Sequence, residues 1–159
     1  MKKLIFCLVL VFFVVAQSAW CKDSNLRDLF KSLDKDETYG GILTLVNVDE
    51  SLKSLKIGFD ISEMKVYVSN PEFNDVKAKN ALKNVLTSVK ASGEYSSLQE
   101  VKEEDVSVKI FLRKEGEQNK ELAIIVVAVE DGEDQLVIVR ITGDMSSEAL
   151  QEIIKGVNI

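Results

Sequence analysis

The sequence contains no histidine and only two cysteines among its 159 residues. Because Ser-His-Asp and Cys-His hydrolases need an imidazole, the absence of histidine excludes both, together with every histidine-bearing zinc site. Cys7 lies inside an apolar leader, so Cys21 is the single cysteine beyond it. One thiol excludes an internal disulfide, CxxC redox chemistry and cysteine-rich metal clusters within one chain. A glycine-rich phosphate loop is also missing from the sequence.

Basic side chains are in the minority, with 20 Lys and Arg against 26 Asp and Glu and a formal net charge of −6. Loss of a leader containing Lys2 and Lys3 would leave 18 basic residues and a charge near −8. Binding to phosphates requires clustered Lys and Arg, so this balance argues against nucleic acid and anionic membranes as partners. The apolar fraction of 46% is ample for the core of one domain.

The N-terminus has the pattern of a secretory signal peptide. Two lysines precede an unbroken apolar run at residues 4–16, and Ser18 and Ala19 supply small residues for cleavage after either position. The run is too short to span a bilayer comfortably. We therefore expect residues 1–19 to be removed on export, and residues 20–159 to form one domain in the periplasm or cell envelope.

Cys21 opens a second interpretation, because a cysteine just after an apolar leader is the lipidated first residue of bacterial lipoproteins. The residue before such a cysteine should be small, and here it is Trp20. Soluble export is therefore the preferred interpretation, and a membrane anchor through lipidated Cys21 is the alternative.

The second half of the chain predicts a meander of antiparallel strands. Ile and Val dominate three apolar runs, as suits a pleated surface, and the middle run is apolar at nearly every position. Asp131-Gly132 predicts a tight hairpin turn, whereas the polar link Lys114–Lys120 suggests a looser loop. The three predicted strands are Val106–Arg113, Glu121–Glu130 and Gln135–Thr142.

Apolar spacing predicts further elements on both sides of the meander. Helices are expected over Leu26–Leu33, Leu52–Phe59, Ala78–Val89 and Leu150–Val157, the last capped by Asp144 or Ser146. Short strands are expected at Ile42–Val48, Met64–Ser69 and Leu98–Lys102. The first two, with the helix between them, suggest a βαβ unit that is right-handed if its strands are parallel neighbours. We therefore predict one α+β domain, with an antiparallel sheet of four to six strands and three to four helices packed mainly on one face.

The ordered segments GEYSSLQEV, VKIFLRKEG, KELAIIVVAVED and VRITGDMS, between Gly93 and Ser146, resemble domain-of-unknown-function family 4252. The matching pattern is a tyrosine and leucine at Tyr95 and Leu98, then Glu121-Leu122, then Ile141–Asp144. The resemblance covers roughly Leu26 to Val157 and is best in the second half. It implies a small exported α+β protein of the kind found in Bacteroidetes, with no known activity and no functional residues to carry over.

Carboxylates are the one abundant chemical group, and they gather at two predicted turns. The turn at Glu130–Asp134 offers oxygen ligands for Ca²⁺ but lacks the spacing of a calcium loop. We therefore interpret both acidic turns as solvated. Glycoside hydrolysis needs two carboxylates facing each other across a cleft, and the sequence places no such pair. We therefore predict no cofactor, metal or catalytic residue. If the protein has a site, we expect it at the rims of the sheet around Tyr95 and Thr142–Asp144. The turn residues are Glu103, Glu104, Asp105, Glu130, Asp131, Glu133 and Asp134.

These observations favour a non-enzymatic protein of the cell envelope that binds another protein. The alternative is a carboxylate-based hydrolase or small-ligand-binding protein of the periplasm. A deep pocket with two or more buried acidic side chains would favour the alternative. A flat surface with solvated carboxylates would count against it.

Overall fold

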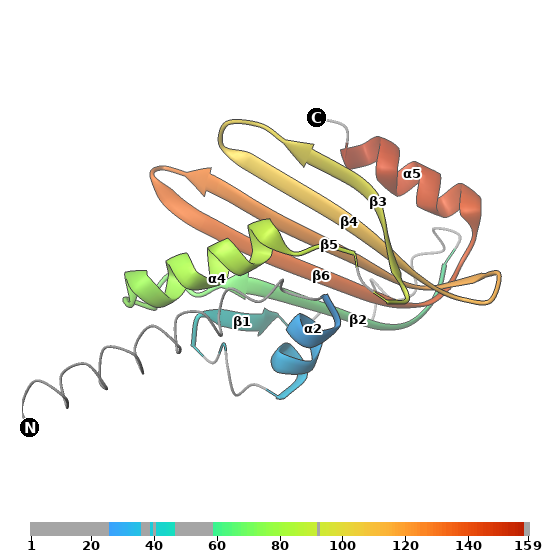
Figure 1. The fold of residues 1–159 in the computed structure, drawn as a ribbon, viewed down its shortest axis with the longest axis horizontal. Helices are drawn as coiled ribbons and strands as arrows, with labels where there is room; N and C mark the ends of the chain where they lie inside the picture. Colours follow the sequence, from blue (N-terminus) through green and yellow to red (C-terminus); the bar gives the residue numbers. More distant parts are fainter. Residues whose placement is uncertain (1–25, 36–38, 40, 47–58, 92, 158–159) are drawn as a thin grey trace, which may run out of the picture.

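A computed structural model describes residues 26–35, 39, 41–46, 59–91 and 93–157. The helices are α2 (Leu26–Lys35), α4 (Val76–Ser88) and α5 (Ser147–Val157). The strands are β1 (Leu43–Val46), β2 (Phe59–Ser69), β3 (Tyr95–Lys102), β4 (Val106–Glu115), β5 (Gln118–Glu130) and β6 (Glu133–Met145). Figure 1 shows one sheet, with α4 and α2 across part of it and α5 near the opposite end.

The sheet has six strands in the order β1-β2-β6-β5-β4-β3, and every neighbouring pair is antiparallel. This confirms the α+β prediction and the meander. β1 and β2 pair antiparallel, so the parallel βαβ interpretation is wrong. Phe59 opens strand β2 instead of ending a helix, and the rest of that predicted helix, like Asn47 and Val48, lies outside the described residues.

Two turns set the register of the meander. Asp131 and Gly132 both have positive φ, 53° and 79°, as the tight primed hairpin turns require. The link between β4 and β5 is tighter than predicted, because Glu115 pairs directly with Gln118. Only Gly116 (φ 62°) and Glu117 lie between them, so polar residues predicted to form a loose loop extend the ladder instead.

Helices α2 and α4 share one face of the sheet, called here the helix-covered face. The apolar side of α2 and Leu82 and Leu86 of α4 join a single buried cluster with Phe111, Ala123 and Ile125 of the strands. Burying each large aliphatic side chain contributes about 1.5–3 kcal/mol. Asp75 caps α4 by accepting a hydrogen bond from the Ala78 amide at 3.0 Å.

Helix α5 packs on the opposite face. Leu150 and Ile153 join a second cluster with Ile110, Leu112 and Leu122. Ser146, not Asp144, caps this helix, since its Oγ accepts from the Ala149 amide at 3.2 Å. Figure 1 shows α5 toward the end of the sheet where β4 turns into β5, away from the β3–β4 and β5–β6 turns. None of the described helices covers the other half of this face.

Gly143 lies inside β6, just beyond Thr142, where the predicted strand ended. Its φ is 151°, and a Cβ placed there would lie 2.0 Å from the Asp60 carbonyl oxygen. The register of the β2–β6 pair shifts beside it, between Ile61 and Glu63. Glycine is required here because the backbone of β2 approaches too closely for any side chain.

Candidate functional site

A charged cluster lies beneath α2 on the helix-covered face. Side chains alternate between the two faces of a strand, so Glu121 of β5 lies on the same face as Ala123, Ile125 and Val127. Glu121 is 1% exposed and is the only acidic residue among the buried residues of the described chain. A carboxylate in such a position requires hydrogen-bond donors, since an unpaired buried charge is strongly unfavourable.

Three other strands supply those donors: β4 and β6 on either side of β5, and β3 beyond β4. The Tyr95 hydroxyl of β3 donates to Glu121 Oε1 at 2.7 Å, and Arg113 Nε of β4 donates to Oε2 at 3.2 Å. Arg140 of β6 donates to both oxygens, from Nε to Oε1 at 2.7 Å and from Nη2 to Oε2 at 3.3 Å. Both carboxylate oxygens are therefore engaged as acceptors of charge-assisted bonds.

The outer half of the cluster connects the sheet to α2. Arg140 Nη1 donates to Asp34 Oδ2 of α2 at 3.1 Å, and Asp34 Oδ1 accepts from Lys65 Nζ of β2 at 3.0 Å. The Arg140 guanidinium also lies 4.7 Å from the centre of the Phe30 ring, and that ring is 5.8 Å from Tyr95. Arg140 thus holds α2 on the sheet through its ion pair with Asp34 and its cation–π contact with Phe30, and its second ion pair joins it to Glu121 of the sheet.

The electrostatics of the cluster favour its charged and hydrogen-bonded forms. Burial raises the pKa of the Tyr95 hydroxyl, and its bond to Glu121 raises it further. Burial alone would lower the pKa of Arg140, but its bonds and attraction to Glu121 outweigh burial and raise it. For Asp34, burial alone would raise the pKa of the carboxyl. The hydrogen bond from Lys65 and the positive charges of Arg140 and Lys65 outweigh burial and lower it.

Two cavities flank Asp34. The smaller, about 220 Å³, lies over the cluster and adds Arg27, Lys31 and Glu94 to its lining. The larger, about 420 Å³, lies between α2 and strands β1 and β2, with Tyr39 among its lining residues. Only the larger has the volume of an ordinary small-molecule pocket, about 300–1,000 Å³.

The cluster suits structural support better than acid–base chemistry. Glycoside hydrolysis needs two carboxylates opposed across a cleft, with one protonated. Here Arg140 contacts both Asp34 and Glu121, and Asp34 is 41% exposed at its side chain. In the part of the chain that the structure describes, no three His, Cys, Asp or Glu side chains are grouped to hold a metal ion.

The residues singled out from the sequence fall in different places. Tyr95 belongs to the cluster, whereas the Thr142 carbonyl accepts from Ser62 at 2.9 Å and Asp144 pairs with Lys120. Cys21 lies outside the described residues. Both acidic turns are exposed, apart from Asp134, which is partly buried and pairs with Lys83.

Sequence reasoning gave no role to the charged residues around which the cluster is built, although Glu121 belongs to the pattern that resembles the family. The available signals were weak: Glu121 is a charge at the start of an apolar strand, and Arg140 interrupts Val139 and Ile141. No sequence signal pointed to Arg113 or Asp34, because each lies at an ordinary polar position of its strand or helix. Their meeting depends on which strands become neighbours, and that is a long-range property of the fold.

The sheet and its three described helices define an α+β protein with a buried charged cluster between α2 and the strands. A family model described as "Domain of unknown function (DUF4252)" matches residues 28–153, and the chain belongs to this family. The predicted family is therefore confirmed.

Among solved structures, the chain is similar to the crystal structure of the Ran-binding protein Mog1p of Saccharomyces cerevisiae. The match has 16% identity and a TM-score of 0.29, and it covers 75% of this chain and 80% of that one. A search of curated proteins found no match. Of the described helices, none is both long and apolar enough to cross a membrane.

Proposed function

We propose that this protein is an exported, non-enzymatic binding protein that docks another protein on the uncovered half of its sheet. The observation that carries this proposal is a row of valines running straight across five strands. The row is Val68, Val137, Val126, Val108 and Val101, each directly paired with the next. A second row lies beside it, at Val66, Val139 and Ile124. These eight residues are called here the open face.

The open face is unusual for a sheet surface in contact with solvent. When one face of an antiparallel sheet meets water, its outward side chains are ordinarily polar. Here all eight are aliphatic, and all but Val108 are partly exposed. With strands about 4.8 Å apart, the valine row spans roughly 19 Å. A contiguous apolar surface of this kind is typical of an interaction site.

The carboxylate-based alternative has less support. A carboxylate-based hydrolase would need a deep pocket with two or more buried acidic side chains. Among the described acidic residues, Glu121 alone is buried. Both of its oxygens accept hydrogen bonds from protein side chains. Export rests on the leader pattern of residues 1–19 and on the resemblance to small exported proteins.

A capture experiment from envelope extracts tests the proposal. The bait variants are Val126→Thr with Val139→Thr on the open face, and Val76→Thr as a matched control on α4, where Val76 is 67% exposed. Threonine keeps the β-branched shape that strands favour while making the surface polar. We expect one protein to be enriched by wild type and by the control, and to fall about tenfold, or 1.4 kcal/mol, with the double variant.

Two outcomes contradict the proposal. One is a lack of enrichment over an unrelated acidic protein, and the other is equal capture by the open-face variant. Urea unfolding of each bait, run beforehand, confirms that the variants are folded at the temperature of the experiment.

A further inference from the structure

Two hairpin turns form an acidic rim at one end of the sheet. The Val129 amide donates to the Asp105 carbonyl at 2.8 Å, which links the β3–β4 turn to the β5–β6 turn. Within the described residues none of the rim carboxylates forms an ion pair, although Lys102 precedes Glu103 directly in the chain. By contrast, Asp134 next to them pairs with Lys83. The acidic rim consists of Glu103, Glu104, Asp105, Glu130, Asp131 and Glu133, all exposed.

The acidic rim borders the open face. Val108 lies three residues after Asp105 in the chain, and Val101 lies two residues before Glu103. The β5–β6 turn likewise continues the strands that carry Val126 and Val137. Helix α5 lies toward the other end of the sheet (Figure 1). The aliphatic rows therefore lie between a packed helix on one side and unpaired negative charge on the other.

We propose, building on the proposed function, that the partner presents a basic amphipathic helix to this surface. Helix α5 already packs its Leu150 and Ile153 on the same face, so a second helix would continue an existing helix-on-sheet layer. An apolar stripe would cover the valine rows, and Lys or Arg beside it would meet the acidic rim. A second copy of this chain or an anionic membrane would bring negative charge to the rim and is disfavoured.

Three synthetic helical peptides of equal length test the chemistry of the partner. The first carries a leucine stripe flanked by lysines, the second the same stripe flanked by glutamates, and the third a scrambled leucine–lysine order. Binding to the full-length chain is measured by fluorescence anisotropy. The first peptide binds, and the other two bind at least about tenfold more weakly. The affinity of the first falls as salt is raised, because exposed charges are screened.

Variants separate the contributions of charge and apolar surface. Glu103→Gln, Glu104→Gln and Glu130→Gln together lower the affinity of the basic peptide about tenfold and flatten its salt dependence. A matched triple variant, Asp28→Asn, Glu72→Gln and Glu117→Gln, removes equal charge from exposed sites that lie neither on the rim nor on α5, and leaves the affinity unchanged. Val126→Thr with Val139→Thr also weakens binding, through the open face.

The outcomes distinguish this inference from the proposed function. Equal binding of the glutamate peptide, or binding to anionic phospholipid vesicles as strong as to the basic peptide, overturns the inference. So does a dimer at about 0.1 M salt that the open-face variant abolishes. If envelope capture depends on the valines but not on the rim, the proposed basic helix is wrong, and the proposed protein-binding function stands. If neither peptide binding nor capture depends on the valines, both fail.

Discussion

At the scale of single residues, Glu121 places a charge in the core where the neighbouring positions of β5 are apolar. Removing a carboxylate from water costs several kcal/mol, and only well-placed donors offset that cost. Tyr95, Arg113 and Arg140 provide four hydrogen bonds from three different strands. The cluster therefore makes the correct neighbours of β5 a condition for a stable fold.

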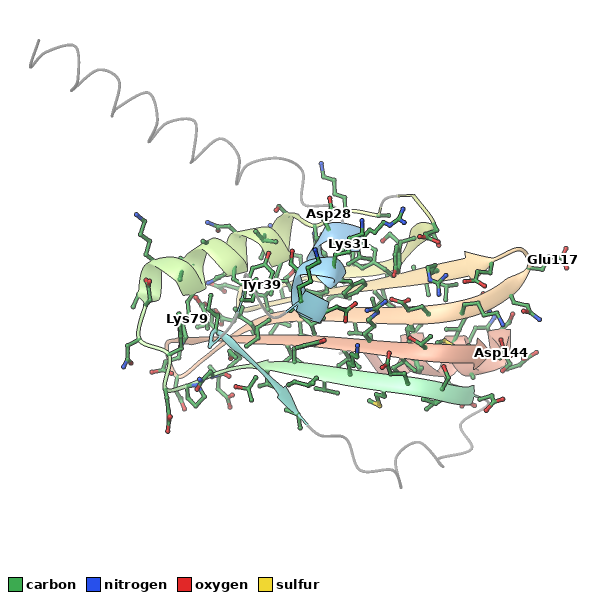
Figure 2. All side chains as sticks on the ribbon, turned by 90° about the horizontal axis from the view of Figure 1, so that it is seen from below. Asp28, Lys31, Tyr39, Lys79, Glu117 and Asp144 are labelled. Atoms are coloured by element: carbon green, nitrogen blue, oxygen red, sulfur yellow. The ribbon has the colours of Figure 1, made fainter. Side chains whose placement is uncertain are left out.

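Replacing Glu121 with glutamine tests this role. The amide nitrogen would face the guanidinium donors of two arginines that are 17% and 19% exposed. Arg140 would lose its buried carboxylate partner, whereas Arg113 would keep its ion pairs with Glu94 and Glu115. We expect Glu121→Gln to lower the free energy of unfolding by about 2–4 kcal/mol in urea titrations. Figure 2 shows Glu117 at the tip of the β4–β5 hairpin, so Glu117→Gln is the control, with an effect within about 0.5 kcal/mol. Equal effects of the two variants would contradict a supporting role for the cluster.

Asp34 gives the cluster a pH dependence. Its pKa is below the ordinary value of 3.8, because the Lys65 bond and the charges of Arg140 and Lys65 outweigh burial. A folded-state pKa that is lowered adds stability above the unfolded value, and this stability is lost as the pH falls through the folded value.

Wild-type protein should therefore lose more stability than Asp34→Asn between about pH 5 and pH 2.5, measured by urea unfolding at each pH. The difference at neutral pH is about 1 kcal/mol or less, since Asp34 is 41% exposed and solvent screens its charge. Asp28→Asn on the same helix, at an exposed position, serves as the control (Figure 2). Parallel pH curves for wild type and Asp34→Asn would refute this account.

At the scale of elements, the close antiparallel pairing of β2 and β6 depends on Gly143. Gly143→Ala would push a methyl group against the Asp60 carbonyl, where the gap to an added Cβ is 2.0 Å. Backbone atoms of a paired strand cannot yield cheaply, so we expect a loss of about 3 kcal/mol or more in unfolding experiments. Gly116→Ala, also at positive φ but with nothing within 4 Å, should cost only about 1 kcal/mol. Comparable losses at the two sites would show that φ, not close approach, sets the cost.

Local patterns in the sequence predicted most of these elements, and for physical reasons. Alternation in Val106–Arg113, the Asp131-Gly132 turn and the stripe of α4 depend on neighbouring residues alone. Non-local choices could not be predicted in the same way. The antiparallel docking of β1 on β2 and the insertion of β2 beside β6 are decided by packing between distant segments. The same limit hid the candidate cluster, since Asp34 and Arg140 meet across 106 positions.

At the scale of the whole molecule, the two faces of the sheet are covered by different elements. The helix-covered face carries α2, α4 and the charged cluster. The opposite face carries α5 at one end and the open face beside it. A partly exposed row of aliphatic side chains on a sheet promotes self-association unless something opposes it. The net charge of −6 and the acidic rim supply that opposition, because identical copies repel.

Salt should therefore control self-association of the free protein. At about 0.1 M salt the Debye length is about 10 Å, and we expect a monomer in sedimentation equilibrium. At about 1 M salt it shrinks to about 3 Å, so repulsion between rims is screened while apolar attraction between open faces remains. Weak, reversible association should then appear for wild type. Val126→Thr with Val139→Thr should stay monomeric under the same conditions, whereas Val76→Thr, on α4, should behave as wild type does. If the double variant associates as strongly as wild type, the contact lies elsewhere on the molecule and the open face does not govern its solubility.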